Sequence, residues 1–263
     1  MFDSLLNTLL VVAALYVYLS LARQVAARQL DGAASLGEKQ FGLPEVIAAT
    51  ILLGWFGWNF KLALSHGEMS LGTIDLVFNV VFSFFVLFAL TSLLQLRGFS
   101  VASLGGFSRL SFGRIVSTAA VLLLAAYPLL YVADTISRWS LGGGSSRQQI
   151  IEMFTGSETL QQRILIIILA IAIAPMTEEF IFRFFLYGVL KRYLGRGAGI
   201  ILNALLFAAV HVHLPSFGPL FLLGACLTLA YEWSGSILVS MTMHALFNFL
   251  TLCALAFPSL LSP

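Results

Sequence analysis

The sequence predicts an all-α, polytopic integral membrane protein, folded as a helical bundle of about eight transmembrane helices. Of its 263 residues, 59% are hydrophobic and only 10% are charged, whereas soluble domains are about 45 to 50% apolar and about 25% charged. The mean hydropathy is +0.96. A chain of this composition cannot cover a water-facing surface, so the soluble globular class is excluded.

Charge and cysteine usage exclude two further kinds of function. The 14 Lys and Arg residues against 12 Asp and Glu give a formal charge of +2. No basic run or base-stacking module accompanies them, so no nucleic-acid partner is expected. The two cysteines, Cys226 and Cys253, lie in apolar stretches without a CxxC spacing. They predict neither a redox pair nor a structural zinc site.

The transmembrane helices are predicted from apolar runs between charged residues and Gly or Pro breaks. A helix that crosses about 30 Å of hydrocarbon needs about 20 mostly apolar residues. Runs that approach or exceed this length occupy residues 4–22, 45–65, 73–95, 115–133, 164–192, 198–213, 217–233 and 236–257.

The first and fifth runs each need a separate interpretation. The first has Asp3 before it and Arg23 after it, so we interpret it as a retained span rather than a cleaved signal peptide. The fifth is too long for one plain span and contains Pro175, which removes a helix hydrogen bond. We expect a kink or break there, with the cytoplasmic half tilted or lying in the interface.

The positive charges predict the orientation of the bundle. One set of connections carries Arg23, Arg28, Lys39, Arg97, Arg109, Arg114, Lys191, Arg192 and Arg196. The other side carries only Arg138, Arg147 and Arg163, with Lys61 at the end of the second span. Both termini are therefore expected to face outward. The long outward connection between the fourth and fifth spans contains Gly142–Ser146, which is typical of a flexible linker.

Ionisable and polar side chains gather in the second half of the chain, at positions where hydrocarbon makes them costly. A charged side chain at the centre of a membrane helix costs about 2.5 to 3.5 kcal/mol or more, so such residues indicate function. The fifth, sixth and eighth spans carry Glu178, Glu179, Arg183, His211, His213, His244 and Asn248. The first four spans hold few polar residues, mostly near their ends.

Helical spacing predicts different roles for these side chains. Glu179 and Arg183 are four residues apart, so they share a face and can form the ion pair that lets an arginine sit at membrane depth. Glu178 is rotated by about 100° from Glu179 and has no local partner. His244 and Asn248 also share a face, while His211 must come from another helix. Three helices are therefore expected to converge on one polar cavity.

Such a cavity can support hydrolysis. A carboxylate and a histidine from facing helices can hold and deprotonate a water molecule. A second histidine and an asparagine amide can donate hydrogen bonds to the oxyanion formed when that water attacks a carbonyl. Glu178, His211 and His244 are equally a reasonable shell for a divalent metal such as zinc. The sequence leaves both forms of the water, metal-bound and metal-free, open.

The three motifs resemble those of one family. Glu178-Glu179-x-x-x-Arg183, Phe207-x-x-x-His211 and His244-x-x-x-Asn248 occur in that order on successive apolar segments. This combination is similar to the CPBP family of CAAX proteases and bacteriocin-processing enzymes, also called Abi. Each motif alone is weak, but all three in this order are fairly specific. The resemblance covers residues 178–248, and the first four spans carry no motif.

The resemblance implies an intramembrane endopeptidase, of glutamate type or metal-dependent, related to the enzyme that trims prenylated CAAX proteins. By this analogy Glu178 and His211 activate the water, and His244 and Asn248 stabilise the oxyanion. Glu179 with Arg183 supports the site. We divide the chain accordingly. One integral membrane domain spans residues 1–263, with motif-free helices over 1–135 and a catalytic CPBP-like core over 160–257.

Other interpretations of the same residues stay open. A proton- or cation-coupled transporter could use the buried Glu and His residues as a relay, and a non-catalytic relative could retain the family's shape. Arg183 could bind a substrate carboxylate, and His213 is better explained as an interfacial histidine. Phe207 is expected to pack. The basic residues at the end of the fifth span are explained by orientation and by anionic lipid headgroups.

The expected partners are a peptide or protein substrate at the membrane and the lipid bilayer. We expect the site to open toward the cytoplasmic side, in a bacterial inner membrane. The sequence names no substrate and no oligomeric state.

Overall fold

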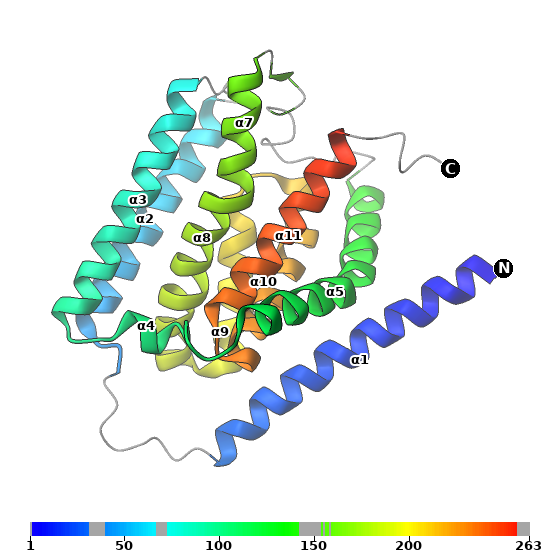
Figure 1. Ribbon diagram of the computed structural model, residues 1–263, viewed down its shortest axis with the longest axis horizontal. Helices are drawn as coiled ribbons and strands as arrows, with labels where there is room; N and C mark the ends of the chain where they lie inside the picture. Colours follow the sequence, from blue (N-terminus) through cyan, green and yellow to red (C-terminus); the bar gives the residue numbers. More distant parts are fainter. Residues whose placement is uncertain are drawn as a thin grey trace.

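The computed structural model describes residues 2–31, 40–66, 73–141 and 159–256, together with residues 154, 156 and 157. The described chain is helical (Figure 1). The first half contains α1 Phe2–Asp31, α2 Leu43–His66, α3 Thr73–Leu96, α4 Val101–Leu104 and α5 Phe112–Ser140. The second half contains α7 Leu160–Ile168, η1 Leu169–Ile173, α8 Ala174–Glu179, η2 Phe180–Leu186, α9 Tyr187–Val210, η3 Leu214–Ser216, α10 Phe217–Ser234 and α11 Ile237–Ala256. The predicted Gly142–Ser146 linker lies outside the described residues.

Within the described residues, 7 helices are long and apolar enough to cross a membrane, which confirms the polytopic helical bundle. The longest apolar stretch, Leu160–Val210, has 51 residues, which is about 75 Å of helix and far more than one bilayer crossing. It contains the predicted fifth and sixth spans. Gly195 interrupts it with φ 80° and ψ 169°, a conformation that glycine adopts readily. The two predicted spans are therefore joined at a glycine break.

The fourth predicted span is longer than expected and bends. It was predicted over 115–133, whereas α5 extends over Phe112–Ser140 and contains Pro128. Figure 1 shows the bend along α5. A proline inside a helix lacks the N–H for one hydrogen bond and clashes with the preceding turn, so it is the expected cause.

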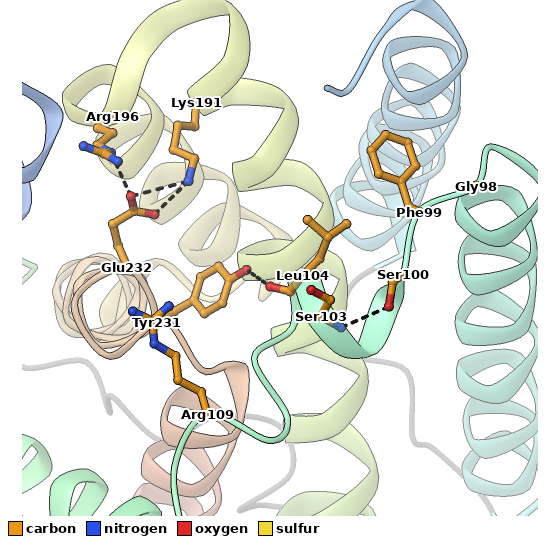
Figure 2. Close-up of a pocket in the computed structure, with 11 residues that line it drawn as sticks. Gly98, Phe99, Ser100, Ser103, Leu104, Arg109, Lys191, Arg196, Tyr231 and Glu232 are labelled. Carbon is orange, nitrogen blue, oxygen red and sulfur yellow. Dashed lines mark hydrogen bonds and ion pairs between the residues drawn. The ribbon is translucent and has the colours of Figure 1, made fainter. Parts of the chain in front are cut away.

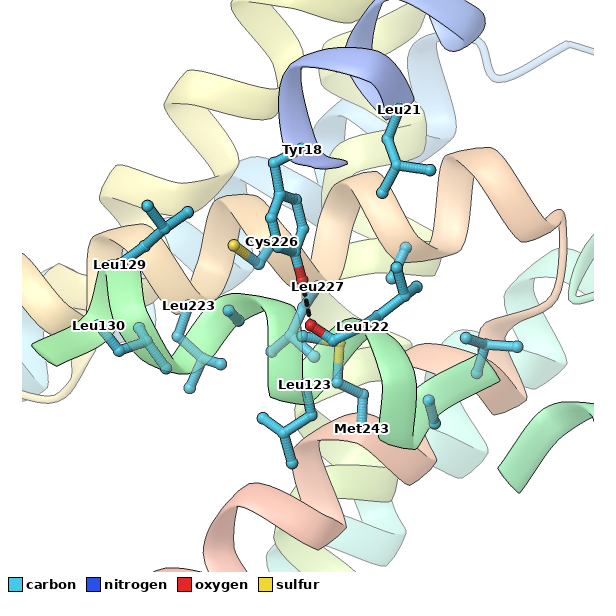
Figure 3. Packing of buried hydrophobic residues seen from close by; sticks show 14 of the residues in the cluster. Tyr18, Leu21, Leu122, Leu123, Leu129, Leu130, Leu223, Cys226, Leu227 and Met243 are labelled. Atoms are coloured by element: carbon cyan, nitrogen blue, oxygen red, sulfur yellow. Dashed lines mark hydrogen bonds between the residues drawn. The ribbon is translucent and has the colours of Figure 1, made fainter. Parts of the chain in front are cut away.

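The centre of the bundle is formed by α10, which packs against α9, α5, α11 and α1. One buried apolar cluster joins α1, α5, α10 and α11, and includes Leu122, Leu223, Leu227 and Met243. Figure 3 shows Tyr18 of α1 reaching into this cluster, where its hydroxyl donates to the Leu122 carbonyl at 2.7 Å. A second cluster joins α2, α3, η2, α9 and α10. The helices of the first half thus pack against the second half through two apolar clusters.

Candidate active site

The helix that carries Glu178 and Glu179 contains two π-helical segments, η1 and η2, on either side of α8. At Pro175 the helix is irregular rather than broken: the π segment η1 ends just before it, and the helix continues as α8. The N–H of Ala174 bonds to the Leu169 carbonyl, five residues back. In this register the next donor would be Pro175, which has no N–H, so the Ala170 carbonyl loses its partner within the helix. Such π segments are frequent at functional sites.

Asn248 of α11 supplies the missing donor. Its Nδ2 donates to the Ala170 carbonyl at 2.8 Å. The proline-widened helix and α11 are therefore joined by a side-chain hydrogen bond at the site. A primary amide carries two N–H groups, so this bond leaves the second N–H of Asn248 for another acceptor.

The predicted pairing of Glu179 with Arg183 is present. Arg183 Nη1 lies 3.1 Å from Glu179 Oε1, and both side chains are 0% exposed. The guanidinium carbon of Arg183 also lies 4.1 Å from the centre of the Phe207 ring, and Nη2 donates to the Gly224 carbonyl at 3.4 Å. A buried charge is tolerable only when it is paired and hydrogen-bonded. The ion pair, the ring and the carbonyl meet this condition in part, because Arg183 Nε and Nη1 and Glu179 Oε2 are buried without a hydrogen bond in the described chain.

His244 lies between the two carboxylates. Its Nδ1 is 2.9 Å from Glu179 Oε1, and its Nε2 is 3.9 Å from Glu178 Oε2. The sequence predicted Glu179 only as the partner of Arg183, but it also orients this imidazole. Because an ionised carboxylate can only accept, Nδ1 donates to Glu179.

His211 follows the last residue of α9 and approaches Glu178 from another side. Its Nδ1 is 2.7 Å from the Phe207 carbonyl, and its Nε2 is 3.9 Å from Glu178 Oε2. A carbonyl accepts only, so Nδ1 carries the proton and the Nε2 lone pair of neutral His211 faces Glu178. The next residue, Val212, has a φ of 49°, which is unusual and costly for a β-branched residue. This strained turn ends α9 at His211.

Glu178 is the point on which the two histidines converge. Its side chain is 28% exposed, whereas that of Glu179 is fully buried, as the predicted rotation between them requires. Glu178 Oε2 is buried and forms no direct hydrogen bond within the described part of the chain. The structure thus brings together Glu178, His211 and His244 from three helical segments, with two imidazole Nε2 atoms facing one carboxylate oxygen.

His213 and Phe207, which lie beside the motif residues, have contacts that differ from those of the residues around Glu178. His213 lies outside this cluster of contacts, and its Nδ1 bonds to Ser216 Oγ at 2.8 Å at the start of α10. Phe207 was expected only to pack, yet its ring lies under Arg183 and meets the His211 ring edge-on, with 4.8 Å between ring centres. Its carbonyl also orients His211. The Phe207-x-x-x-His211 spacing is the signal from which this role could be inferred, since i and i+4 share a helix face.

Gly224 is a residue that the sequence interpretation missed. A Cβ at this position would lie 3.1 Å from a ring carbon of Phe207 and 3.2 Å from Cα of Ala204. Glycine therefore lets α10 approach α9 closely, as small residues do between membrane helices. This approach brings the Gly224 carbonyl to Arg183, and Thr228 Oγ1 donates to the same carbonyl at 2.8 Å.

The side chains around Glu178 do not form a metal site in this arrangement. No group of three His, Cys, Asp or Glu residues in the described chain has the arrangement of a metal site. Glu178 Oε2 lies 3.9 Å from each histidine Nε2. A metal ion bound by these three atoms would have to draw them closer together. The residues as placed do not fit a metal ion, so the proposed chemistry uses only the side chains of this site.

The site lies far from the basic end of the bundle. Arg196 and His211 are at opposite ends of one helical segment of α9, about 20 Å apart along its axis. Arg109, Lys191 and Arg196 line the same pocket, so two of the predicted basic connections meet at one end of the bundle. The opening of the site toward the cytoplasm stays a prediction.

The comparisons with known proteins agree with the motifs. Residues 160–250 match the family model "Type II CAAX prenyl endopeptidase Rce1-like". No curated protein and no solved structure matches the chain significantly. The matched segment begins with α7 and ends within α11, and it contains all three motifs. The resemblance to the CPBP family is therefore confirmed over residues 160–250: this is an integral multi-pass membrane protein whose C-terminal segment matches the Rce1-like endopeptidase family.

Proposed function

We propose that the chain is an intramembrane endopeptidase of the CAAX type, which hydrolyses a peptide bond of a membrane-associated, prenylated peptide or protein. A bacterial inner membrane is its proposed location. The observation that carries the proposal is the convergence of His211 Nε2 and His244 Nε2 on Glu178 Oε2, at 3.9 Å each. The match of residues 160–250 to an endopeptidase family supports the reaction class.

The separations suit one water between Glu178 and His211. Two acceptors 3.9 Å apart are too distant for a direct hydrogen bond, but a water with hydrogen bonds of about 2.8 Å can bridge them. The water donates one hydrogen to the carboxylate and one to the Nε2 lone pair. Glu178 then removes a proton as the water oxygen attacks the peptide carbonyl carbon.

His244 and Asn248 are the proposed oxyanion donors. When His244 carries both ring protons, Nδ1 donates to Glu179 and Nε2 can donate to the oxyanion. The second N–H of Asn248 supplies another donor. On collapse of the tetrahedral intermediate the C–N bond breaks, and the proton held by Glu178 passes to the leaving amine. The products are a carboxylic acid and an amine, with one water consumed.

Glu179 and Arg183 act through their neighbours in this scheme. Glu179 Oε1 lies 2.9 Å from His244 Nδ1 and so holds the imidazole with its Nε2 directed at Glu178. Arg183 offsets the Glu179 charge, and Phe207 holds both Arg183 and His211. The positions of these residues favour a supporting role for Arg183 over binding of a substrate carboxylate, since its guanidinium is fully buried.

Cleavage by the purified protein in lipid tests the proposal. Wild type and Glu178→Gln are compared on matched prenylated and unprenylated peptides, with product termini identified by mass spectrometry. We expect wild type to cleave the prenylated peptides and Glu178→Gln to lose this activity while inserting normally. Retained cleavage by Glu178→Gln would overturn the assigned base, and no cleavage of any peptide by wild type would contradict the endopeptidase.

A second set of reactions tests whether the attacking water is bound to a metal ion. Each reaction is repeated with a chelator and with added zinc. We expect no change with chelator, because the described donors do not form a metal site. Loss with chelator and recovery with zinc would show instead that Glu178, His211 and His244 move inward to hold a metal, which would activate the water as a Lewis acid.

A further inference from the structure

A second polar site lies at the basic end of the bundle, away from the proposed catalytic residues. It is a cavity of about 640 Å³ between the α3–α5 connection, α9 and the end of α10 (Figure 2). Its charged lining consists of Arg109, Lys191, Arg196 and Glu232. Three cations against one anion leave a net positive charge. The cavity size falls within the range of about 300 to 1,000 Å³ that is usual for small-molecule sites.

Glu232 is already neutralised by two of the cations. Its Oε2 lies 3.0 Å from Lys191 Nζ, its Oε1 lies 2.8 Å from Arg196 Nε, and its side chain is only 8% exposed. The two basic residues come from opposite sides of the Gly195 break, so the break brings both onto one carboxylate. This pairing orders one wall of the cavity and leaves little negative charge to repel an anionic ligand.

Arg109 carries one of the two net positive charges, and the group of Lys191, Arg196 and Glu232 carries the other. It is exposed and forms no ion pair with any carboxylate in the described chain. Its guanidinium lies against Gly235, where a Cβ would clash with Nη1. Gly235 has a φ of 65°, so glycine permits both the turn after α10 and the approach of the arginine.

The opposite wall is held in place by backbone contacts. Ile237 N donates to the Gly105 carbonyl at 2.9 Å, and a Cβ on Gly106 would clash with the Gly235 carbonyl at 2.0 Å. Ser100 and Ser103 line this wall, and each hydroxyl can donate a hydrogen bond. In Figure 2 they lie across the cavity from Lys191 and Glu232, and the Ser100 hydroxyl accepts a hydrogen bond from Ser103 N.

We propose that this cavity binds the phosphate group of an anionic phospholipid, with Arg109 as its principal contact. A planar guanidinium matches a phosphate oxygen pair, and the serine hydroxyls add neutral donors. The cavity lies at the ends of membrane helices, where headgroup phosphates are present at high local concentration. The expectation that the basic residues attract anionic headgroups in general becomes a specific one, that a headgroup binds in this cavity. This inference is independent of proteolysis.

Lipid binding to the full-length protein tests the site. Detergent-purified protein is titrated with phosphatidylglycerol or phosphatidylcholine and the bound lipid is counted by native mass spectrometry. Arg109→Gln is compared with Arg114→Gln, which removes an equal charge from a nearby exposed arginine outside the cavity. We expect Arg109→Gln to weaken phosphatidylglycerol binding about tenfold, and Arg114→Gln to weaken it less than about twofold.

A second pair of variants tests the same wall without touching an arginine. Ser103→Asp introduces a negative charge into the cavity, and Ser108→Asp introduces one just outside it. Only Ser103→Asp should weaken binding. Competition with inorganic phosphate distinguishes the sources of the ligand: failure of millimolar phosphate to displace the lipid supports the headgroup, and displacement supports a site for free phosphate instead. Equal effects within each pair, or no preference for phosphatidylglycerol, would overturn the proposal.

Discussion

The two halves of the bundle differ in where their ion pairs lie and in how deeply they are buried. In the first half, ion pairs lie near helix ends: Glu45 at the start of α2 pairs with Arg97, and Asp134 pairs with Arg138 in the last turns of α5. In the second half, Glu232 near the end of α10 pairs in the same way with Lys191 and Arg196. Only in this half, among the described ion pairs, are both partners fully buried within a continuous helical stretch, as Glu179 and Arg183 are. A pair at a helix end secures a connection, whereas a pair in the interior is costly and has to serve the site that it supports.

The difference extends to backbone geometry. The described helices of the first half are α-helical, and Pro128 bends α5. In the second half, Pro175 is accommodated in a π segment whose free carbonyl is bound by Asn248. Irregular helix geometry is therefore concentrated where Glu178, His211 and His244 converge. The second half forms the site, and α3 and α5 of the first half pack against the helices that carry it.

The largest expected effect is on the cleavage rate, which a change in the second half should lower and a change in the first half should not. Glu178→Gln removes the proposed base, so cleavage should fall by about 10² to 10⁴-fold, measured as single-turnover rates in lipid. Glu45→Gln is the matched control, because it alters a fully buried carboxylate of the first half. It should leave turnover per folded molecule unchanged. A comparable loss of turnover in Glu45→Gln would abolish the functional distinction between the halves.

The next effect concerns the stability of the ion pairs. Glu179→Gln leaves Arg183 buried without its counter-charge, so unfolding in detergent should require about 3 to 5 kcal/mol less free energy. Asp134→Asn breaks a partly exposed pair and should cost no more than about 1 kcal/mol. Denaturant unfolding of both variants measures this difference. Unchanged stability in Glu179→Gln together with abolished cleavage would show that the two adjacent carboxylates have exchanged roles.

A smaller effect tests the bond between Asn248 and the π segment. Asn248→Ala leaves the Ala170 carbonyl unsatisfied and should cost about 1 to 3 kcal/mol of stability. Pro175→Ala restores an N–H within the helix, so the double variant should recover part of this loss. Cleavage should not recover, since the proposed oxyanion donor stays absent. Full recovery of cleavage in the double variant would show that Asn248 acts only through the helix.

The smallest effect concerns the strained turn after α9. Val212→Gly removes a Cβ from a residue with a φ of 49°, so thermal stability should rise by up to about 1 kcal/mol. The greater freedom of glycine should also loosen His211 and lower the cleavage rate modestly. Melting temperature and cleavage rate are measured on the same samples. A lower melting temperature would show that the valine side chain contributes more than its backbone conformation costs.

Much of the site was predictable because its patterns are local. Glu179 and Arg183 share a helix face by spacing alone, and Glu178 is rotated away from them by the helix geometry. The three motifs, in order over residues 178–248, also predicted the family, and the family model matches residues 160–250. Phe207 was underestimated because an aromatic residue in an apolar span is ordinarily packing, and only its contacts with Arg183 and His211 distinguish it.

The sequence by itself determined the membrane class, the spans and the pairings within one helix, because hydropathy and a 3.6-residue period are properties of consecutive residues. Only the tertiary structure decided how the helices are rotated against one another. That rotation places His244 between two carboxylates, brings Asn248 to a carbonyl freed by Pro175, and gathers Arg109 and Lys191 around one cavity. Such contacts join residues far apart in the chain, so they depend on close packing and on glycines that no local period reveals.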